Sequence, residues 1–264
     1  MSTDTFEGLP REVAVPRLIE EHGGRLYTLG KQFCGDPDEA EDLVQEVFMQ
    51  AWRKWDQFEG RSNPGTWLYT IASRVCQRLH RKRAGEPDHF ESIDSETFAL
   101  EGPQAVLPDG GDPLSEQIRR EGRERVEAAI AALPLDFRMP LVLKEVVGFS
   151  VAEVSAIVDI KEATVKTRLH RARAKLRDAL DAGLPHGDGP PAMYSREVCL
   201  DLLQSKQDHL DRNLPFTFPD GVICERCAIV FATMDLAIDT CSDLAKGELP
   251  DKIRVALFER LHEA

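Results

Sequence analysis

Apolar residues recur at helical intervals along most of the chain, and the alternation typical of a strand is absent. Two segments in the first third show this pattern most clearly. The first begins at Asp36, where acidic residues occupy the first turn, as is favourable at a helix N-terminus. The pattern predicts an all-α fold. The two apolar faces consist of Leu43, Val44, Val47, Phe48, Ala51, Trp52 and Trp55, and of Trp67, Leu68, Ile71, Ala72, Val75 and Leu79.

A pair of short helices is predicted further along. Ser150 is followed three residues later by Glu153, which is the pattern of a capping box at the start of a helix. A tight turn is expected at 159–161, and a second helix from about Glu162. This spacing is typical of a helix-turn-helix. The buried stripe of its second helix comprises Val165, Leu169, Ala172 and Leu176.

Two segments divide the chain into three modules. Residues 84–118 contain nine acidic residues, no Lys or Arg, and many Gly and Pro, which indicates a flexible acidic linker. Residues 183–191 form a second stretch rich in Gly and Pro. The expected modules are therefore 10–83, 119–182 and 192–264.

The net charge of −13 argues against nucleic-acid binding only if the charge is uniform, and it is not. Residues 161–177 hold seven basic residues and one acid, and residues 67–83 hold five basic residues and no acid. Aromatic residues beside the second basic run could stack on unpaired bases while the cations hold phosphates. The alternative for both segments is an ordinary amphipathic helix with a basic solvent face.

Several classes are disfavoured. No window approaches the roughly 18 apolar residues of a membrane span, and Met1–Glu7 lacks the character of a signal peptide, so a cytoplasmic protein with no membrane partner is expected. Six cysteines are too few and too uneven for a disulfide scaffold. No catalytic Ser/His/Asp order, phosphate loop or HExxH motif is present, so no enzymatic activity is expected.

The motifs together resemble a known family. Leu133–Leu143 (LPLDFRMPLVL), Gly148–Val154 (GFSVAEV) and Thr164–Arg173 (TVKTRLHRAR) are similar to region 4 of extracytoplasmic-function (ECF) sigma factors of the sigma-70 family. Asp38–Phe48 (DEAEDLVQEVF) and Thr66–Ala72 (TWLYTIA) are similar to region 2. The resemblance covers roughly residues 17–180 and implies a region 2 bundle, a region 4 helix-turn-helix and promoter-specific transcription initiation.

The resemblance also implies residue roles and partners. Core RNA polymerase would bind the region 2 module through Asp42, Gln45 and Glu46. Promoter DNA would be bound at the minus-ten element by Arg61, Asn63, Trp67, Arg74 and Arg78, and at the minus-thirty-five element by Lys161, Thr164, Lys166, Thr167, Arg168 and Arg171. Arg74 and Ala163 stand where the family often has Asn and Gly. An ordinary helix-turn-helix regulator that does not act through core polymerase is the alternative.

The last module contains a candidate metal site. Cys224 and Cys227 form a CxxC pair, and Cys199 lies 25 residues before Cys224. This arrangement resembles zinc-binding anti-sigma domains, with Asp220 at the position of their histidine, and implies a small helical zinc-finger-like domain. Buried thiols without metal are the alternative. The fourth ligand stays open among Asp220, His209 and Cys241, and His209 could serve only if its helix breaks before it.

A fused module of this kind suggests control in cis. We expect residues 192–264 to pack on the sigma modules and to mask polymerase- or DNA-binding surface until metal or thiol state changes. Tethering would give even a weakly binding module a high effective concentration. A separate anti-sigma factor is the other candidate regulatory partner.

Overall fold

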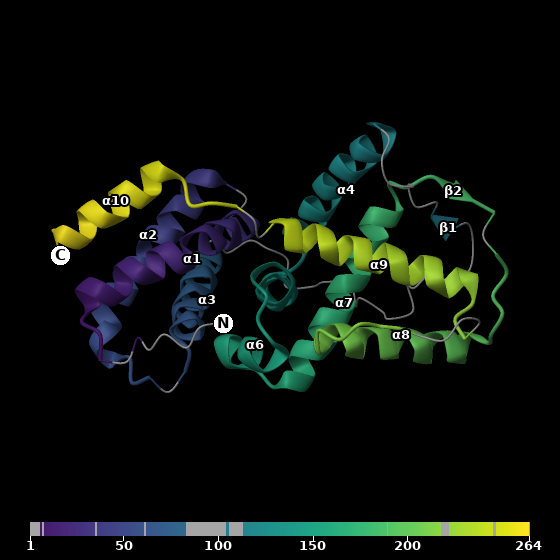
Figure 1. Cartoon of the computed structure of the whole chain (residues 1–264), viewed down its shortest axis with the longest axis horizontal. Helices are drawn as coiled ribbons and strands as arrows, with labels where there is room; N and C mark the ends of the chain where they lie inside the picture. The colour runs from purple at the N-terminus through teal and green to yellow at the C-terminus, as the bar shows by residue number, and fades with distance from the viewer. Residues whose placement is uncertain are drawn as a thin grey trace. The chain divides into compact units, whose positions relative to one another are not determined.

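The chain was analysed as a computed structural model, which describes residues 6, 8–34, 36–60, 62–82, 104–105, 113–188, 190–217, 222–244 and 247–263 (Figure 1). Nearly all the described elements are helices, which confirms the all-α prediction. The predicted linker 84–118 lies mostly outside the described residues. Within these residues, no helix is long and apolar enough to cross a membrane.

The elements follow one another in a simple order. The capping box predicted at Ser150 is present, since Glu153 N donates to Ser150 Oγ (3.2 Å) and Ser150 N donates to Glu153 Oε2 (2.8 Å). The elements are α1 (Arg11–Cys34), α2 (Pro37–Lys54), η1 (Trp55–Gln57), α3 (Pro64–Lys82), β1 (Gln104–Ala105), α4 (Pro113–Ala132), α5 (Leu135–Leu141), the π-helical η3 (Val142–Val147), α6 (Val151–Val158), α7 (Glu162–Asp181), β2 (His186–Gly187), α8 (Arg196–Asp211), α9 (Glu225–Leu244) and α10 (Asp251–His262).

Two compact units are formed, and neither is continuous in sequence. The first contains the described residues of Met1–Asp88, Val142–Lys161 and Asp243–Ala264, and the second contains those of His89–Leu141 and Glu162–Ser242. The division falls between α6 and α7, the two helices of the predicted helix-turn-helix. The predicted module 119–182 is therefore shared between the units, and the module boundaries stay a prediction.

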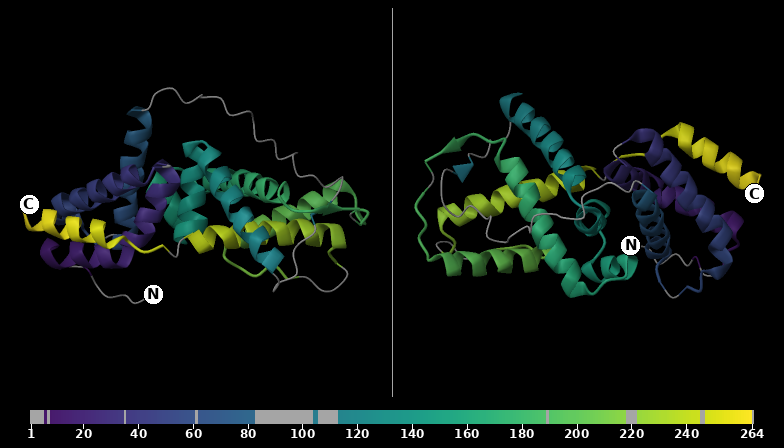
Figure 2. Two further views of the ribbon diagram at one scale, coloured as in Figure 1. Left: turned by 90° about the horizontal axis from the view of Figure 1, so that it is seen from above. Right: turned by 180° about the vertical axis from the view of Figure 1, so that it is seen from behind.

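In the first unit, α1, α2 and α3 pack together around a core that includes Leu26, Phe48 and Leu68, all fully buried. The helix α6 packs on α3, and Phe149 lies edge-on to Tyr69 with ring centroids 4.9 Å apart. The C-terminal helix α10 lies along α1 and α2 (Figure 2). The end of the chain is thus part of the region 2 bundle.

In the second unit, α4 and α5 pack on α7. Arg138 of α5 is buried and donates through Nη2 to the carbonyl oxygen of Leu133 (2.7 Å) and to that of Ala131. These bonds satisfy carbonyls that the end of α4 leaves free. The strands β1 and β2 make a minimal antiparallel pair, with Gln104 opposite Gly187. Helices α8 and α9 run side by side and share an apolar cluster (Figure 1).

Candidate functional site

The polar face of α2 contains the three residues assigned to polymerase binding. Asp36 caps this helix, because its Oδ1 accepts from Asp38 N at 2.8 Å, and this fixes where α2 begins. Asp42 is exposed and Gln45 is half-buried. Glu46 accepts from Gln50 Nε2 (2.8 Å) and Arg78 Nη2 (3.0 Å). The three residues therefore lie within about one turn, off the apolar stripe.

The hydrogen bond from Gln50 and the charge of Arg78 lower the pKa of Glu46, although partial burial opposes them. Glu46 is thus a carboxylate anchored to α3 at neutral pH. Arg78, assigned to promoter DNA, is engaged with Glu46 in this structure, although both side chains remain over 40% exposed. An exposed pair of this kind contributes little free energy and exchanges readily for a phosphate contact.

The residues assigned to the minus-ten element surround the start of α3. Asn63 is exposed, and its Oδ1 accepts from Gly65 N at 2.8 Å, so it shapes the turn that begins the helix. Arg74 is exposed, whereas Arg61 lies outside the described residues. Trp67 is half-buried against Trp55 and Phe58, with ring centroids 5.6 and 5.4 Å away. One edge of Trp67 is therefore core, and the remainder is open to a partner.

The residues assigned to the minus-thirty-five element lie at and after the start of α7. Lys161, Thr164 and Thr167 are exposed, and Lys166 and Arg171 are half-buried. Arg168 Nη2 donates to Asp136 Oδ2 of α5 at 2.8 Å, with the arginine side chain 24% exposed. The first two turns of α7 thus present polar and basic side chains, as a helix entering a major groove must.

A second face of α7 is covered by α8, which the sequence did not reveal. Arg173 is fully buried, and its Nη1 donates to Asp211 Oδ1 (2.7 Å) and to Gln207 Oε1 (3.0 Å). His170 Nε2 lies 3.3 Å from Asp211 Oδ2. In sequence, Arg173 counts only as one more cation of a basic helix. Its partner lies 38 residues later, beyond the reach of any local pattern.

Three cysteines meet between α8 and the start of α9. Cys199, Cys224 and Cys227 are buried in one apolar cluster, and Cys227 Sγ lies 3.7 Å from Cys199 Sγ. Burial raises the pKa of Cys227, and its neighbouring thiols raise it further. Burial also acts to raise the pKa of Cys224, but hydrogen bonds led by that from the Met193 backbone outweigh it and lower the pKa. One of three adjacent thiols is thus favoured as a thiolate.

Two of the three candidate fourth ligands are out of reach. The helix α8 runs unbroken from Arg196 to Asp211, so Cys199 and His209 lie about 15 Å apart along its axis. Cys241 lies in α9 fourteen residues after Cys227, about 21 Å along that axis. His209 instead contacts Phe216, with ring centroids 5.1 Å apart. Asp220 lies outside the described residues and stays a prediction.

Comparison with known proteins agrees with this division of surfaces. A model of sigma-70 region 2 matches residues 18–86, and a model of sigma-70 region 4 matches residues 123–176. The ECF RNA polymerase sigma factor SigE of Mycolicibacterium smegmatis is 30% identical over 191 residues, which cover 67% of each chain. The ECF sigma factor SigW of Bacillus subtilis is 32% identical over 166 residues, covering 62% of this chain and 87% of SigW.

Among solved structures, the sigma factor RpoE of Bartonella quintana in complex with the anti-sigma factor NepR is similar. It is 31% identical, covers 59% of this chain and 89% of RpoE, and has a TM-score of 0.42.

Two sigma-70 regions in one chain define a transcription initiation factor of the sigma-70 class. More narrowly, the chain belongs to the ECF family of RNA polymerase sigma factors. It directs promoter-specific initiation and binds core polymerase and promoter DNA. The match to region 2 decides against an ordinary helix-turn-helix regulator, and the family acts by binding rather than by catalysis. Both family models end before residue 177, so the C-terminal module lies outside them.

Proposed function

We propose that this sigma factor uses three surfaces and is regulated in cis by residues 192–264. Asp42, Gln45 and Glu46 of α2 bind core polymerase. The turn before α3 and the exposed parts of α3 bind the minus-ten element, and the start of α7 binds the minus-thirty-five element. These activities place the protein with polymerase and DNA in the cytoplasm, and they require no catalytic group.

The regulatory proposal rests on the position of α10 against α2. Lys252 Nζ of α10 lies 3.2 Å from Glu41 Oε2, the residue directly before Asp42. Gln45 follows Glu41 by one helical turn, so the two share a face of α2. Ile253, Leu257 and Leu261 of α10 are buried, which gives the docked helix an apolar contact face. A helix held here covers surface beside the residues assigned to polymerase.

The chain before α10 is seated closely on α1. A Cβ atom at Gly24 would come within 2.6 Å of the carbonyl oxygen of Gly247, and one at Gly23 within 2.8 Å of Leu249 Cδ2. Contacts below 3.0 Å force one of the two segments to move. The pair of glycines in α1 is therefore what allows residues 247–249 to lie against it.

Zinc at the cysteines supports this module. Two thiolates on one tetrahedral zinc ion lie about 3.8 Å apart, because each Zn–S bond is about 2.3 Å. Cys199 and Cys227 are 3.7 Å apart, and Cys224 and Asp220 would complete the set. The ion would fix the start of α9 on α8 and so hold together the part of the module that binds α7. The residues that supply it are protein ligands throughout, as in a structural site.

The test is the affinity of the full chain for core polymerase. Leu257→Asp places a charge in the buried face of α10, and Gly24→Ala displaces residues 247–249 without touching α2 or α10. Both variants are expected to bind core at least tenfold more tightly than the wild type and to initiate more run-off transcription. Val255→Asp is the matched control, since Val255 of α10 is 55% exposed.

Masking by α10 is wrong if Leu257→Asp and Gly24→Ala bind core no more tightly than Val255→Asp. Core binding by Asp42→Ala is measured in the Leu257→Asp background, where α10 no longer interferes. A loss there, with Glu39→Ala of the same helix unaffected, is the expected result for direct contact at Asp42.

A further inference from the structure

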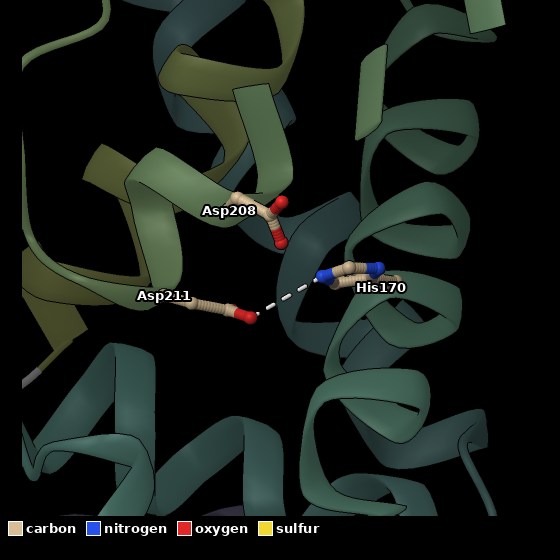
Figure 3. A group of neighbouring side chains, drawn as sticks. All are labelled: His170, Asp208 and Asp211. Atoms are coloured by element: carbon tan, nitrogen blue, oxygen red, sulfur yellow. Dashed lines mark hydrogen bonds and ion pairs between the residues drawn. The ribbon is translucent and has the colours of Figure 1, made fainter. Parts of the chain in front are cut away.

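A second group of metal-ligating side chains lies where α8 covers α7. Among the residues that the structure describes, His170, Asp208 and Asp211 form a group whose ligand atoms all lie within 4.8 Å of one another. Figure 3 shows His170 reaching from α7 toward the two aspartates, which both come from α8. Asp208 and Asp211 are three residues apart and so share one face of that helix. The group joins two helices that are distant in sequence.

The distances within the group suit an ion. His170 Nε2 and Asp211 Oδ2 are 3.3 Å apart. Two ligands on a tetrahedral ion with bonds of about 2.0–2.1 Å lie about 3.3 Å apart, so this pair needs no movement to bind one ion. Asp208 is half-buried and accepts only a 3.2 Å bond from Gln204 in the printed geometry of its own helix, which leaves its second oxygen for the ion.

The surroundings hold the ligands in place. Arg173 and His170 contact different oxygens of Asp211, because Arg173 Nη1 donates to Oδ1 and His170 faces Oδ2. Gln207 Oε1 accepts a second bond from Arg173, and Gln207 Nε2 donates to the carbonyl oxygen of His170 at 3.5 Å. Partners of this kind orient metal ligands and limit their rotamers. The Asp211 side chain is 1% exposed, so its orientation is fixed by these contacts rather than by water.

From these observations we infer that His170, Asp208 and Asp211 bind a divalent first-row transition metal ion, which joins the promoter-reading helix α7 to α8. One imidazole and two carboxylates are a ligand set that Fe²⁺, Co²⁺ and Zn²⁺ accept, with positions left for water. His170 and Asp208 are both partly exposed, so water and the ion have access. This site uses none of the three cysteines.

The charge balance also favours an ion. With neutral His170, the two aspartates and Arg173 sum to −1, and Arg173 is the cation that the geometry pairs with Asp211. A divalent ion raises the sum to +1 and gives Asp208 a partner of opposite charge. Since α7 belongs to the region 4 helix pair and α8 to the C-terminal module, the ion strengthens their contact. For its effect on transcription the inference rests on the proposed cis regulation, whereas metal binding is tested by itself.

The probe is Zn²⁺, bound to the full chain and measured by equilibrium dialysis and calorimetric titration. The wild type is expected to bind one equivalent that Asp208→Asn and His170→Gln lose, with an affinity at least about 100-fold lower in each. Asp201→Asn is the matched control, since Asp201 is an exposed aspartate of α8 and the substitution removes the same charge. Cys227→Ser is expected to retain the equivalent that depends on Asp208.

Each outcome decides the inference. Equal zinc stoichiometry and affinity in the wild type, Asp208→Asn and Asp201→Asn overturns it and leaves an ordinary network of hydrogen bonds. Loss in Asp208→Asn with an unchanged far-UV spectrum supports it, because Asp208 is only half-buried and its replacement keeps the bond from Gln204. If the ion binds but transcription is the same in all variants, the metal site stands and the proposed cis regulation fails.

Discussion

Arg173 and Asp211 form an ion pair that is almost wholly withdrawn from water, with Nη1 and Oδ1 2.7 Å apart and side chains 0% and 1% exposed. Arg173 belongs to the helix that reads promoter DNA, and Asp211 ends the first helix of the C-terminal module. A charge buried in this way is tolerated only with its partner present. The basic helix and the C-terminal module therefore form one folded unit, not two domains joined by a linker.

We first predict that Asp211→Ala lowers the free energy of unfolding of the second unit by about 3–5 kcal/mol, because it leaves Arg173 buried without its partner. Arg173→Met is expected to cost a similar amount by stranding Asp211. The double variant is expected to lose much less than the sum, since neither charge is then left buried. Urea unfolding followed by far-UV circular dichroism provides the measurement.

The matched control is Arg168→Met paired with Asp136→Ala. These residues also form a 2.8 Å ion pair, but the Asp136 side chain is 69% exposed. Each change is expected to cost under about 1 kcal/mol, as for other exposed pairs. Additive effects at Arg173 and Asp211 would contradict a coupled buried pair.

Much of the local structure could be predicted because it depends on neighbours in sequence. The capping box of Ser150 and Glu153 involves residues three apart, and its hydrogen bonds form as expected. Trp67 was ambiguous for a physical reason, since an aromatic residue on an apolar stripe serves equally as core or as a base-stacking platform. Only its contacts with Trp55 and Phe58 show that it is partly core.

The non-local part could not be predicted. A basic helix looks the same in sequence whether Arg173 faces water or an aspartate 38 residues later. Likewise, nothing local to α10 shows that Lys252 lies beside Glu41, which precedes it by 211 residues. The unbroken α8, by contrast, settles through helix geometry that His209 and Cys199 do not share an ion.

A second prediction concerns His22 in α1, whose ring lies edge-on to Tyr69 with centroids 5.9 Å apart. Burial lowers the pKa of His22, and the charge of Arg25 adds to this against the opposing charge of Glu21. The unfolded chain therefore takes up a proton at higher pH than the folded chain. Stability is fully present above the unfolded pKa of about 6.5 and declines as the pH falls through the folded pKa.

The measurement is urea unfolding at pH 7.5 and 5.5, followed by tryptophan fluorescence, because Trp52, Trp55 and Trp67 all lie in the first unit. The wild type is expected to lose up to about 1.4 kcal/mol per pH unit from this group, and His22→Gln to lose that dependence. His262→Gln, which changes an exposed histidine of α10, is the control. A pH dependence retained in full by His22→Gln would rule out this origin.

The third prediction separates phosphate contact from base contact at the start of α7. Lys161 is exposed beside the helix N-terminus, where a lysine contacts phosphate rather than base edges. Lys161→Gln is expected to weaken promoter binding by the holoenzyme to a similar extent for different minus-thirty-five sequences. The slope of log affinity against log salt should fall in magnitude by about 0.9.

Lys252→Gln removes the same charge from α10 and is expected to leave that slope unchanged. Binding titrations at four salt concentrations measure both variants. A loss that varies strongly among minus-thirty-five sequences would show that Lys161 reads bases and would contradict the assignment.

The last prediction concerns zinc at the cysteines and is made in the Asp208→Asn background, so that the ion proposed at His170 does not contribute. A ligand that binds only the folded chain stabilises it in proportion to the logarithm of its concentration over Kd. Removing zinc with a chelator is therefore expected to lower the melting temperature by several degrees. Adding Cys227→Ser should cause a similar loss and abolish the chelator's effect, because three ligands hold zinc far less tightly than four. Adding Cys76→Ser instead, at a buried thiol of α3, should leave the chelator's effect intact. Chelator-independent melting of the chain with all its cysteines would mean that Cys199, Cys224 and Cys227 are core thiols without metal.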